Sequence, residues 1–412
     1  MKYGLIGERL GHSFSKEVHA ALASYEYELK EITREDLPSF MLEKEFNAIN
    51  VTIPYKEAVI PFLDEISDEA RSMGAVNTVV NNGGRLCGYN TDFFGMRSLF
   101  EKLGIEASGK KIAILGSGGT AKTAYAVSKS LGAAEILIVS RQKKNGAIDY
   151  PELYRDHSDV DIIINTTPVG MYPNNGDSPI DINVFKNLSG VIDAIYNPLR
   201  TALVLDAMSK GIPAEGGLYM LIAQAVYASE IFLNTKYPES KIDEIYHSIS
   251  FDKESIALIG MPSSGKSTVG RIVADILGRE LIETDEIIVK KVGKCIKDIF
   301  KDDGETAFRD IESDIIKEVS AKNGRIVSTG GGCILRSENI KALRQNSKIV
   351  FIDRSLENLI ASDDRPLSHS LEAVKSLYEA RYENYKAAAD FSVNGNNAPQ
   401  AVAQEIIGGL KK

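Results

Sequence analysis

The sequence predicts a soluble α/β protein of several domains built around parallel sheets. Its 412 residues are enough for two to four domains. Two short apolar runs, Ile112–Leu115 and Ile256–Ile259, are each followed by a glycine-rich turn and then by a helical pattern. The turns read GSGGTA (Gly116–Ala121) and GMPSSGKS (Gly260–Ser267). A strand, a glycine turn and a helix in this order begin a βαβ unit, so we expect one such unit in each half of the chain.

Composition and charge narrow the class of protein. A hydrophobic content of 43% with 25% charged residues is typical of globular proteins. The net charge of −9 argues against general nucleic-acid binding, which needs broad basic surface. The three cysteines, Cys87, Cys295 and Cys333, form no C-x-x-C pair, and no run approaches about 18 apolar residues. We therefore expect a cytoplasmic protein with no nucleic-acid and no membrane partner, and the sequence makes no prediction of the oligomeric state.

The pattern of apolar runs divides the chain into successive parts. We expect an α/β domain over residues 1–100, which helices at about 206–247 complete. A second α/β domain spans 101–205 and opens with the first βαβ unit. Residues 248–254 are polar with few structural cues, and we expect a linker there. A further α/β domain with a parallel sheet covers 255–412.

The first glycine turn predicts a dinucleotide site. Backbone N–H groups at the start of the following helix can face a pyrophosphate. The next strand ends about twenty residues later, where an NAD site usually carries an acidic residue. Here the strand ends with Arg141, followed by Gln142, Lys143 and Lys144. A cationic turn suits the 2′-phosphate, so we expect NADP(H) rather than NAD; the alternative is a solvated run of surface charge.

The second glycine turn fits the phosphate-binding pattern G-x-x-x-x-G-K-[ST], which fixes Gly265, Lys266 and Ser267 after a strand. In such a P-loop, backbone N–H groups cradle the phosphates, the lysine reaches the outer phosphates and the hydroxyl binds Mg²⁺. We therefore expect ATP and Mg²⁺ in the second half. The P-loop by itself does not identify the group that accepts the phosphoryl.

Ordered motifs extend over residues 1–247: GHSFS (11–15), NVTIPYK (50–56), GYNTD (88–92), NTTPVGM (165–171), DAIYNP (193–198) and GGLYMLIAQA (216–225). Taken singly, Ser13, Ser15 and Asp92 read as helix caps, and Lys56 reads as a surface lysine. As an ordered set, the motifs resemble the shikimate dehydrogenase family. Lys16 departs from that family, which usually has proline after the second serine.

This resemblance implies NADPH-dependent reduction of 3-dehydroshikimate to shikimate, with a substrate domain (1–100 and 206–247) and a Rossmann NADP domain (101–205). Lys56 and Asp92 are the implied catalytic pair, because an ammonium can protonate the developing alkoxide while a carboxylate holds it in place. The implied substrate contacts are Ser13, Ser15, Thr52, Asn77, Tyr196 and Gln224. The implied cofactor contacts are Gly116, Gly118, Gly119, Thr120, Ala121, Arg141, Thr166, Met171 and Gly217.

A second set of motifs follows the P-loop: IETDE (282–286), GETAFRDIE (304–312), TGGG (329–332) and DRPL (364–367), with Arg381 beyond them. In this order they resemble shikimate kinase over residues 255–412. The resemblance implies a base, Asp285, and two groups that act on the transferred phosphoryl, Lys266 and Arg365. The implied shikimate contacts are Arg309, Gly331, Gly332 and Arg381. The implied nucleotide contacts are Gly265, Lys266, Ser267 and Thr268, and the implied metal-site residues are Ser267 and Glu283.

Two features of this half depart from the kinase family. Glu283 stands where the family usually has aspartate near the metal, and the segment 356–364 is short and lacks an expected lid arginine. For Arg309 and Arg381 an alternative role stays open, namely structural salt bridges with Glu312 and Glu379.

Together the two resemblances imply consecutive steps of chorismate biosynthesis, with shikimate as the product of the first half and the substrate of the second. The alternatives are a non-catalytic shikimate-binding sensor in one half, an NAD-using quinate/shikimate dehydrogenase in the first half, and a kinase for another small acceptor in the second. We expect that joining the two activities in one chain serves to produce them in equal amounts. The alternative is channelling of shikimate from the first site to the second.

Overall fold

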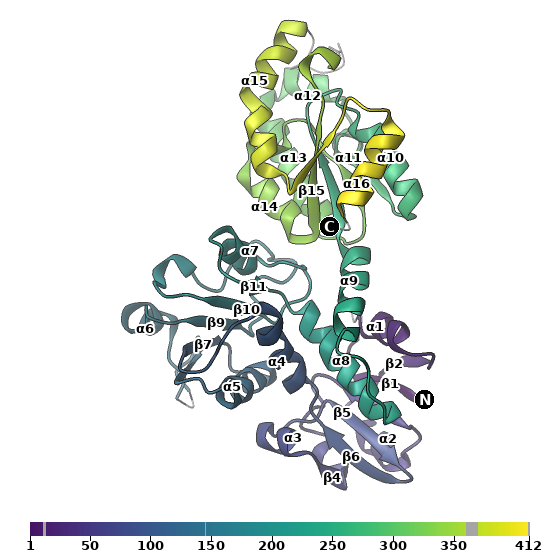
Figure 1. The fold of residues 1–412 in the computed structure, drawn as a ribbon, viewed down its shortest axis with the longest axis vertical. Helices are drawn as coiled ribbons and strands as arrows, with labels where there is room; N and C mark the ends of the chain where they lie inside the picture. Colours follow the sequence, from purple (N-terminus) through teal and green to yellow (C-terminus); the bar gives the residue numbers. More distant parts are fainter. Residues whose placement is uncertain (11–13, 145, 360–369, 411–412) are drawn as a thin grey trace. The chain divides into compact units, whose positions relative to one another are not determined.

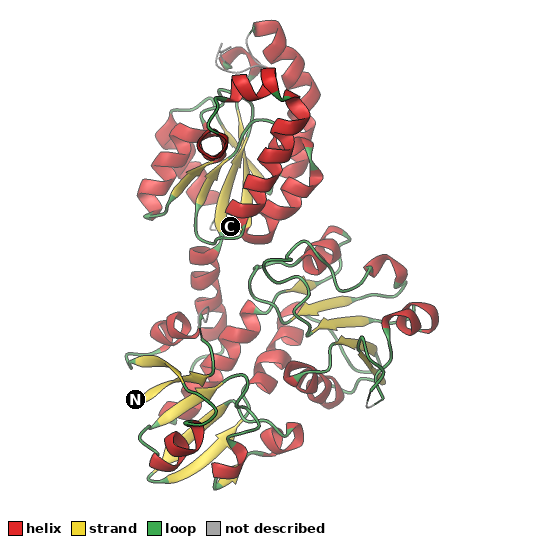
Figure 2. Cartoon of the chain, turned by 180° about the vertical axis from the view of Figure 1, so that it is seen from behind, coloured by secondary structure: helices red, strands yellow, loops and turns green. Residues whose placement is uncertain are grey.

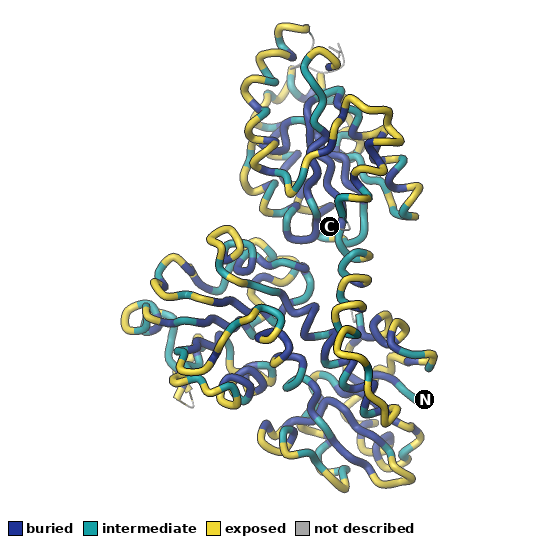
Figure 3. The backbone as a smooth tube through the Cα atoms, viewed as in Figure 1, coloured by how far each residue is buried: buried dark blue, intermediate teal, exposed yellow. Residues whose placement is uncertain are grey.

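The computed structural model divides into two compact units, Met1–Ile249 and Ser250–Lys412, which are purple to teal and green to yellow in Figure 1. It describes residues 1–10, 14–144, 146–359 and 370–410. These residues form three sheets, whose strands are flanked by helices (Figure 2). In both units the buried chain lies mainly along the strands (Figure 3). The expected α/β class with parallel sheets is confirmed.

The first sheet of the N-terminal unit is mixed, in the order β2-β1-β3-β5-β6-β4. Strands β1, β2 and β3 are parallel, whereas β5 is antiparallel to β3 and β6. Gly83 and Gly84 turn the β5–β6 hairpin with φ angles of 63° and 95°, as a tight hairpin turn requires. The elements are β1 (Tyr3–Gly7), α1 (Ser15–Leu22), β2 (Tyr27–Glu31), α2 (Leu37–Glu43), β3 (Ala48–Val51), β4 (Glu65–Ile66), α3 (Asp68–Met73), β5 (Thr78–Asn82) and β6 (Arg85–Tyr89).

The second sheet is entirely parallel, in the order β11-β10-β9-β7-β8. Successive side chains of its central region alternate between two apolar cores, because a strand has a period of two: Ile112 and Ile114 lie in one, Ala113 and Leu115 in the other. The elements are α4 (Asp92–Leu103), β7 (Lys111–Leu115), α5 (Gly119–Ser130), β8 (Glu135–Val139), α6 (Tyr150–Asp156), β9 (Ile162–Asn165), β10 (Gly190–Asp193), α7 (Ala202–Ser209) and β11 (Ala214–Glu215).

Two further helices, α8 (Leu218–Leu233) and α9 (Lys241–Lys253), complete the N-terminal part. Helix α8 packs against α4 and α1. Ile245 and Ile249, four residues apart, bury one side of α9 in the same apolar cluster as α8. The segment that we expected as a linker is therefore helical through Lys253, and the boundary between the two units falls within this helix.

The sheet of the C-terminal unit is parallel, in the order β13-β14-β12-β15-β16. Its elements are β12 (Ser255–Ile259), α10 (Lys266–Leu277), β13 (Leu281–Glu283), α11 (Thr284–Val292), α12 (Ile296–Asp302), α13 (Gly304–Ser320), β14 (Ile326–Ser328), α14 (Ser337–Asn346), β15 (Ser347–Asp353), α15 (Leu371–Ala388), β16 (Phe391–Asn394) and α16 (Pro399–Gly409). Among the helices of the described residues, none combines the length and the hydrophobicity that a membrane span requires.

Candidate active sites

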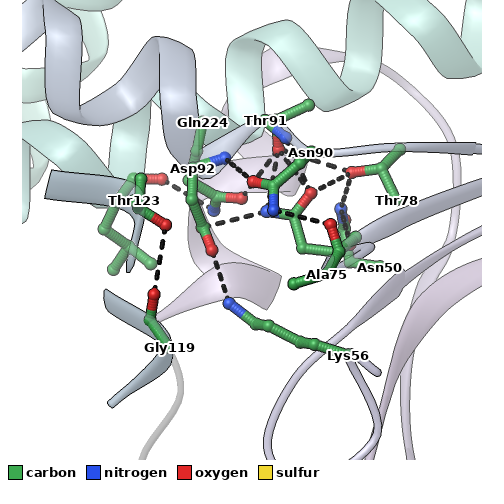
Figure 4. A network of polar contacts seen from close by, with 12 residues as sticks. Asn50, Lys56, Ala75, Thr78, Asn90, Thr91, Asp92, Gly119, Thr123 and Gln224 are labelled. Atoms are coloured by element: carbon green, nitrogen blue, oxygen red, sulfur yellow. Dashed lines mark hydrogen bonds and ion pairs between the residues drawn. The ribbon is translucent and has the colours of Figure 1, made fainter. Parts of the chain in front are cut away.

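Lys56 and Asp92 form an ion pair inside the N-terminal unit. Lys56 follows β3, and Asp92 is the first residue of α4. Lys56 Nζ lies 2.5 Å from Asp92 Oδ2, and the two side chains are 26% and 17% exposed (Figure 4). The other oxygen, Asp92 Oδ1, accepts a hydrogen bond of 2.9 Å from Asn77 Nδ2. The carboxylate therefore uses both oxygens to hold the ammonium and the amide in fixed places.

A buried polar network supports this pair. Asn77 Oδ1 accepts from the Thr91 backbone N–H at 2.7 Å, and Asn77 Nδ2 donates to Thr91 Oγ1 at 3.1 Å. Thr91 Oγ1 donates in turn to Gln224 Oε1 on α8 at 3.3 Å. These contacts join the residue before β5 to the start of α4 and to α8, so the orientation of Asp92 depends on three segments of the chain. Figure 4 shows Thr91, Asp92 and Gln224 in this network.

Both members of the pair line a cavity of about 480 Å³. The expected substrate contacts among the described residues all line it: Ser15, Thr52, Asn77, Tyr196 and Gln224. Ser13 lies outside the described residues. Arg9 and Asn50 also line the cavity, although neither was among the predicted contacts. Both had a signal in the sequence, because Arg9 stands two residues before the GHSFS motif and Asn50 begins the NVTIPYK motif. Lys56 and Arg9 make the cavity suitable for an anionic ligand.

The first glycine turn has the close packing that a dinucleotide loop needs. Gly116 has a φ of 110°, and a Cβ there would lie 2.7 Å from Thr166 Oγ1, which donates to the Leu115 carbonyl at 2.6 Å. A Cβ on Gly217 would lie 2.2 Å from the Ala194 carbonyl. Both positions therefore require glycine. Gly118 precedes α5, Gly119 begins it, and Thr120 and Gly217 line the cavity around Lys56.

A second cavity of about 890 Å³ lies along α5 and the end of β8. Ala121, Arg141 and Lys144 line it, together with Ser72 and Met73 from α3. Lys143 does not line it, because its ammonium pairs with Glu152 at 2.5 Å and Asp149 at 3.3 Å. The cationic turn is thus divided between the second cavity and surface ion pairs. Met171, another of the expected cofactor contacts, has a residue exposure of 44%.

In the C-terminal unit, the P-loop joins β12 to α10. Gly265, immediately before α10, has a φ of 94°, and Lys266 Nζ donates to the carbonyls of Gly260 and Met261, both at 2.9 Å. Ser267 Oγ donates to Glu283 Oε2 at 2.6 Å, and Thr268 is exposed on the same turn of α10. Hydroxyl and carboxylate oxygens are the donors that Mg²⁺ prefers, so this pair fits the implied metal.

The residues that we expected to contact shikimate, the group that accepts the phosphoryl, meet at the glycines that follow β14. A Cβ on Gly330 would lie 2.8 Å from Asp285 Oδ1, and a Cβ on Gly332 would lie 2.0 Å from Arg309 Nη1. Arg381 Nη1 donates to the Gly331 carbonyl at 3.2 Å. Gly331 also packs against the P-loop, because its Cβ would lie 3.0 Å from Pro262 Cδ. The carboxylate of Asp285 and both guanidinium groups are thereby brought beside the phosphate loop.

Arg309 is held by two carboxylates. Its Nη1 lies 2.7 Å from Glu312 Oε2, and its Nη2 lies 3.1 Å from Glu305 Oε1. Burial raises the pKa of the fully buried Glu312 carboxyl. The salt bridge weighed as an alternative for Arg309 is therefore present, and it orients the guanidinium. Glu379 instead pairs with Lys375 at 4.0 Å, and Arg365 lies outside the described residues.

Comparison with known proteins assigns a family to each unit. Residues 5–79 match the family model of the shikimate dehydrogenase substrate binding domain, and residues 262–411 match that of shikimate kinase. Shikimate dehydrogenase (NADP(+)) of Clostridium beijerinckii is 37% identical over 268 residues, which cover 61% of this chain and 98% of that protein. The protein of the same name from Methanococcus maripaludis is 38% identical over 256 residues, covering 57% of this chain and 91% of its own.

Solved structures agree. A chorismate mutase/shikimate 5-dehydrogenase fusion protein from Clostridium acetobutylicum has a TM-score of 0.57 at 38% identity, covering 60% of this chain and 96% of its own. Shikimate dehydrogenase 1 from Peptoclostridium difficile has a TM-score of 0.54 at 39% identity, covering 60% of this chain and 98% of its own. Both resemblances seen in the sequence are confirmed. The chain therefore belongs to the shikimate dehydrogenase family through its N-terminal unit, and it carries a shikimate kinase domain in its C-terminal unit.

Proposed function

We propose that this chain catalyses two consecutive reactions: the NADPH-dependent reduction of 3-dehydroshikimate to shikimate, and the ATP-dependent phosphorylation of shikimate to shikimate 3-phosphate. One observation carries the proposal. Each unit brings a nucleotide loop together with the polar residues its chemistry needs, Lys56 and Asp92 in the first and Asp285, Arg309 and Arg381 in the second.

In the first reaction, bound NADPH would supply a hydride to the ketone carbon. Lys56 donates a proton to the carbonyl oxygen as charge develops there, so that the ketone becomes a secondary alcohol. Asp92 keeps the ammonium at this position through the 2.5 Å contact. Ser15 and Arg9, which line the same cavity, are suited to hold the substrate carboxylate.

In the second reaction, Mg²⁺ held with ATP on the side of Ser267 and Glu283 would neutralise phosphate charge. Arg309 and Arg381 hold the shikimate carboxylate, and Asp285 accepts the proton of the attacking hydroxyl. Lys266 reaches the outer phosphates and stabilises the charge on the transferred group. Ser267 and Glu283 would hold this metal through their side-chain oxygens.

The two reactions would follow one another in chorismate biosynthesis, because the alcohol made by the first is the acceptor of the second. The net direction toward shikimate 3-phosphate is part of the proposal, as are matched production of the two activities and a cytoplasmic location. The boundaries of the substrate and NADP domains, 1–100 with 206–247 and 101–205, also remain proposals.

Two alternatives predict different measurements. A non-catalytic shikimate-binding sensor would bind ligands without turnover, although Lys56, Asp92, Lys266 and Asp285 are all present. A dehydrogenase of quinate that uses NAD would turn over quinate with NAD at a rate comparable to shikimate with NADP. The cation Arg141 at the second cavity favours NADP.

Separate assays on the full chain test the proposal. With shikimate we expect reduction of NADP, and with shikimate, ATP and Mg²⁺ we expect release of ADP. Lys56→Ala should abolish the first activity alone, and Lys266→Ala the second alone, so each variant is the folding control for the other. If the wild-type protein released no shikimate-dependent ADP, the kinase part of the proposal would be wrong.

A further inference from the structure

Arg354 places an arginine side chain at the edge of the P-loop. It directly follows β15, whose last residue is Asp353. A Cβ placed on Gly265 would lie 3.9 Å from Arg354 Nη1. Gly265 is the residue before Lys266, in the turn that leads into α10. The guanidinium therefore lies beside the backbone that cradles phosphate in a P-loop.

The main chain around Arg354 is fixed on its other side. Asp353 pairs with Asn394 in the β15–β16 ladder, and the Gly395 N–H donates to the Asp353 carbonyl at 2.8 Å. A Cβ on Gly395 would lie only 3.2 Å from Arg354 Cβ. Asn396 Oδ1 accepts from the Ser355 N–H at 3.1 Å. Arg354 thus stands between the P-loop and the turn that joins β16 to α16, on a rigid support.

The charge of Arg354 has no counterpart within the described part of the chain. No carboxylate there forms an ion pair with it, and its Nε is buried without a hydrogen-bond partner. The neighbouring carboxylate, Asp353, accepts instead from the Tyr382 hydroxyl at 3.0 Å. A partly buried guanidinium without a partner is costly, and a bound anion would remove that cost. By contrast, Arg325 in the same unit is paired, with Glu280 at 2.8 Å.

We infer that Arg354 is a nucleotide-binding residue of the C-terminal unit, whose guanidinium holds the polyphosphate of bound ATP or ADP. The inference rests on the proposed kinase function. A planar guanidinium matches phosphate oxygens with two parallel hydrogen bonds, which an ammonium cannot form. Arg354 would act beside Lys266 as a second cation on the phosphates. No motif in the sequence marks it, since a single arginine after a strand carries no signal.

Calorimetric titration of the full chain tests the inference, with the dehydrogenase site filled by NADP. The probes are Mg·ATP, Mg·ADP and adenosine. Arg354→Gln should weaken the binding of both Mg·ATP and Mg·ADP about 10- to 100-fold and leave adenosine unchanged. Arg354→Lys should lose less, because the charge remains. Lys317→Gln, at an exposed site on α13, makes the same change of charge and should bind Mg·ATP like the wild type.

Three outcomes would overturn the inference or its basis. If Arg354→Gln bound Mg·ATP as tightly as the wild type, Arg354 would not hold the nucleotide, while the kinase proposal would stand. If adenosine binding fell as much as Mg·ATP binding, the contact would be with the base and the polyphosphate assignment would be wrong. If the wild-type chain itself bound no Mg·ATP, the proposed kinase function would fail. An unchanged circular-dichroism melting curve for Arg354→Gln excludes loss of the fold.

Discussion

Asp92 bridges Lys56 and Asn77, with Lys56 Nζ at 2.5 Å from one carboxylate oxygen and Asn77 Nδ2 at 2.9 Å from the other. The ammonium is thereby held in the cavity at a place set by the segment after β3, the residue before β5 and the first residue of α4. A proton donor is effective only where it meets the oxygen that develops charge, so the role proposed for Lys56 in the proposed reduction depends on this position.

Replacing Lys56 should therefore lower turnover more than binding. We expect Lys56→Ala to reduce kcat for the dehydrogenase reaction about 10²- to 10⁴-fold with a small change in KM. Steady-state kinetics with 3-dehydroshikimate and NADPH measure both constants, and ADP release by the second unit is the folding control. A large rise in KM with kcat unchanged would assign Lys56 to substrate binding instead.

The cationic turn after β8 offers a matched pair of variants. Arg141 lines the second cavity, whereas Lys143 is paired with Glu152 and Asp149. Arg141→Gln should raise the KM for NADPH about 10- to 100-fold, because a charge-assisted hydrogen bond to the 2′-phosphate is lost, and change the KM for NADH little. Lys143→Gln should leave both constants near the wild-type values. Equal effects of the two substitutions would contradict this division of the turn.

Gly332 should be intolerant of a side chain. A Cβ there would lie 2.0 to 2.3 Å from three atoms of the Arg309 guanidinium, which is buried and held by Glu312. Gly332→Ala should displace that guanidinium and raise the KM for shikimate in the kinase reaction about tenfold or more. Gly408→Ala is the control, since nothing lies within 4 Å of a Cβ at that position. If Gly332→Ala had the kcat and KM of the wild-type kinase reaction, the proposed contact between Arg309 and shikimate would be wrong.

His19 should make the N-terminal unit sensitive to acid. It is fully buried, stacks on Tyr27 with ring centroids 3.8 Å apart, and contacts the Tyr25 hydroxyl at 2.5 Å. Burial lowers the pKa of His19 from 6.5 to about 3. Between these values the unfolded chain binds a proton that the folded chain does not, so stability is lost as the pH falls below 6.5. At pH 5 this lowers the free energy of unfolding by about 2 kcal/mol.

Urea titrations at pH 7 and pH 5 measure this loss. The unfolded fraction at each urea concentration is read by pulse-labelling the backbone amides of α1, and the labelling pulse is applied at one common pH. His19→Phe keeps an aromatic ring for the stack but cannot titrate, so its pH dependence should be smaller than that of the wild type. Identical pH dependence in the two proteins would show that another group causes the acid sensitivity.

Sequence patterns predicted both strand, glycine-turn and helix units correctly, because these units are set by local chemistry. Gly116 and Gly265 both have positive φ angles, which glycine adopts at little cost. The β5–β6 hairpin also had a local signal, the Asn82-Gly83 pair, which is typical of a hairpin turn. The prediction from apolar runs did not include it. The helical segment 248–253 had one too, since Ile245 and Ile249 are spaced as on one face of a helix.

Other features could not come from local pattern. Lys143 does not line the second cavity because it pairs with Glu152 of α6 and with Asp149, the N-cap of that helix. The fold brings these two carboxylates to it. Arg354 reaches the P-loop because β15 pairs with β12, although the two residues that meet, Arg354 and Gly265, are far apart in the sequence. Such contacts depend on sheet order, which single-residue spacing does not encode.

The decisive measurement is a one-pot reaction of the purified full chain with 3-dehydroshikimate, NADPH, ATP and Mg²⁺, followed by mass spectrometry. Conversion to shikimate 3-phosphate, with one NADPH oxidised and one ADP released for each molecule formed, is the predicted result. Accumulation of shikimate with no phosphate ester, or persistence of the ketone while both nucleotides remain unspent, would contradict the assignment of two active sites to this chain.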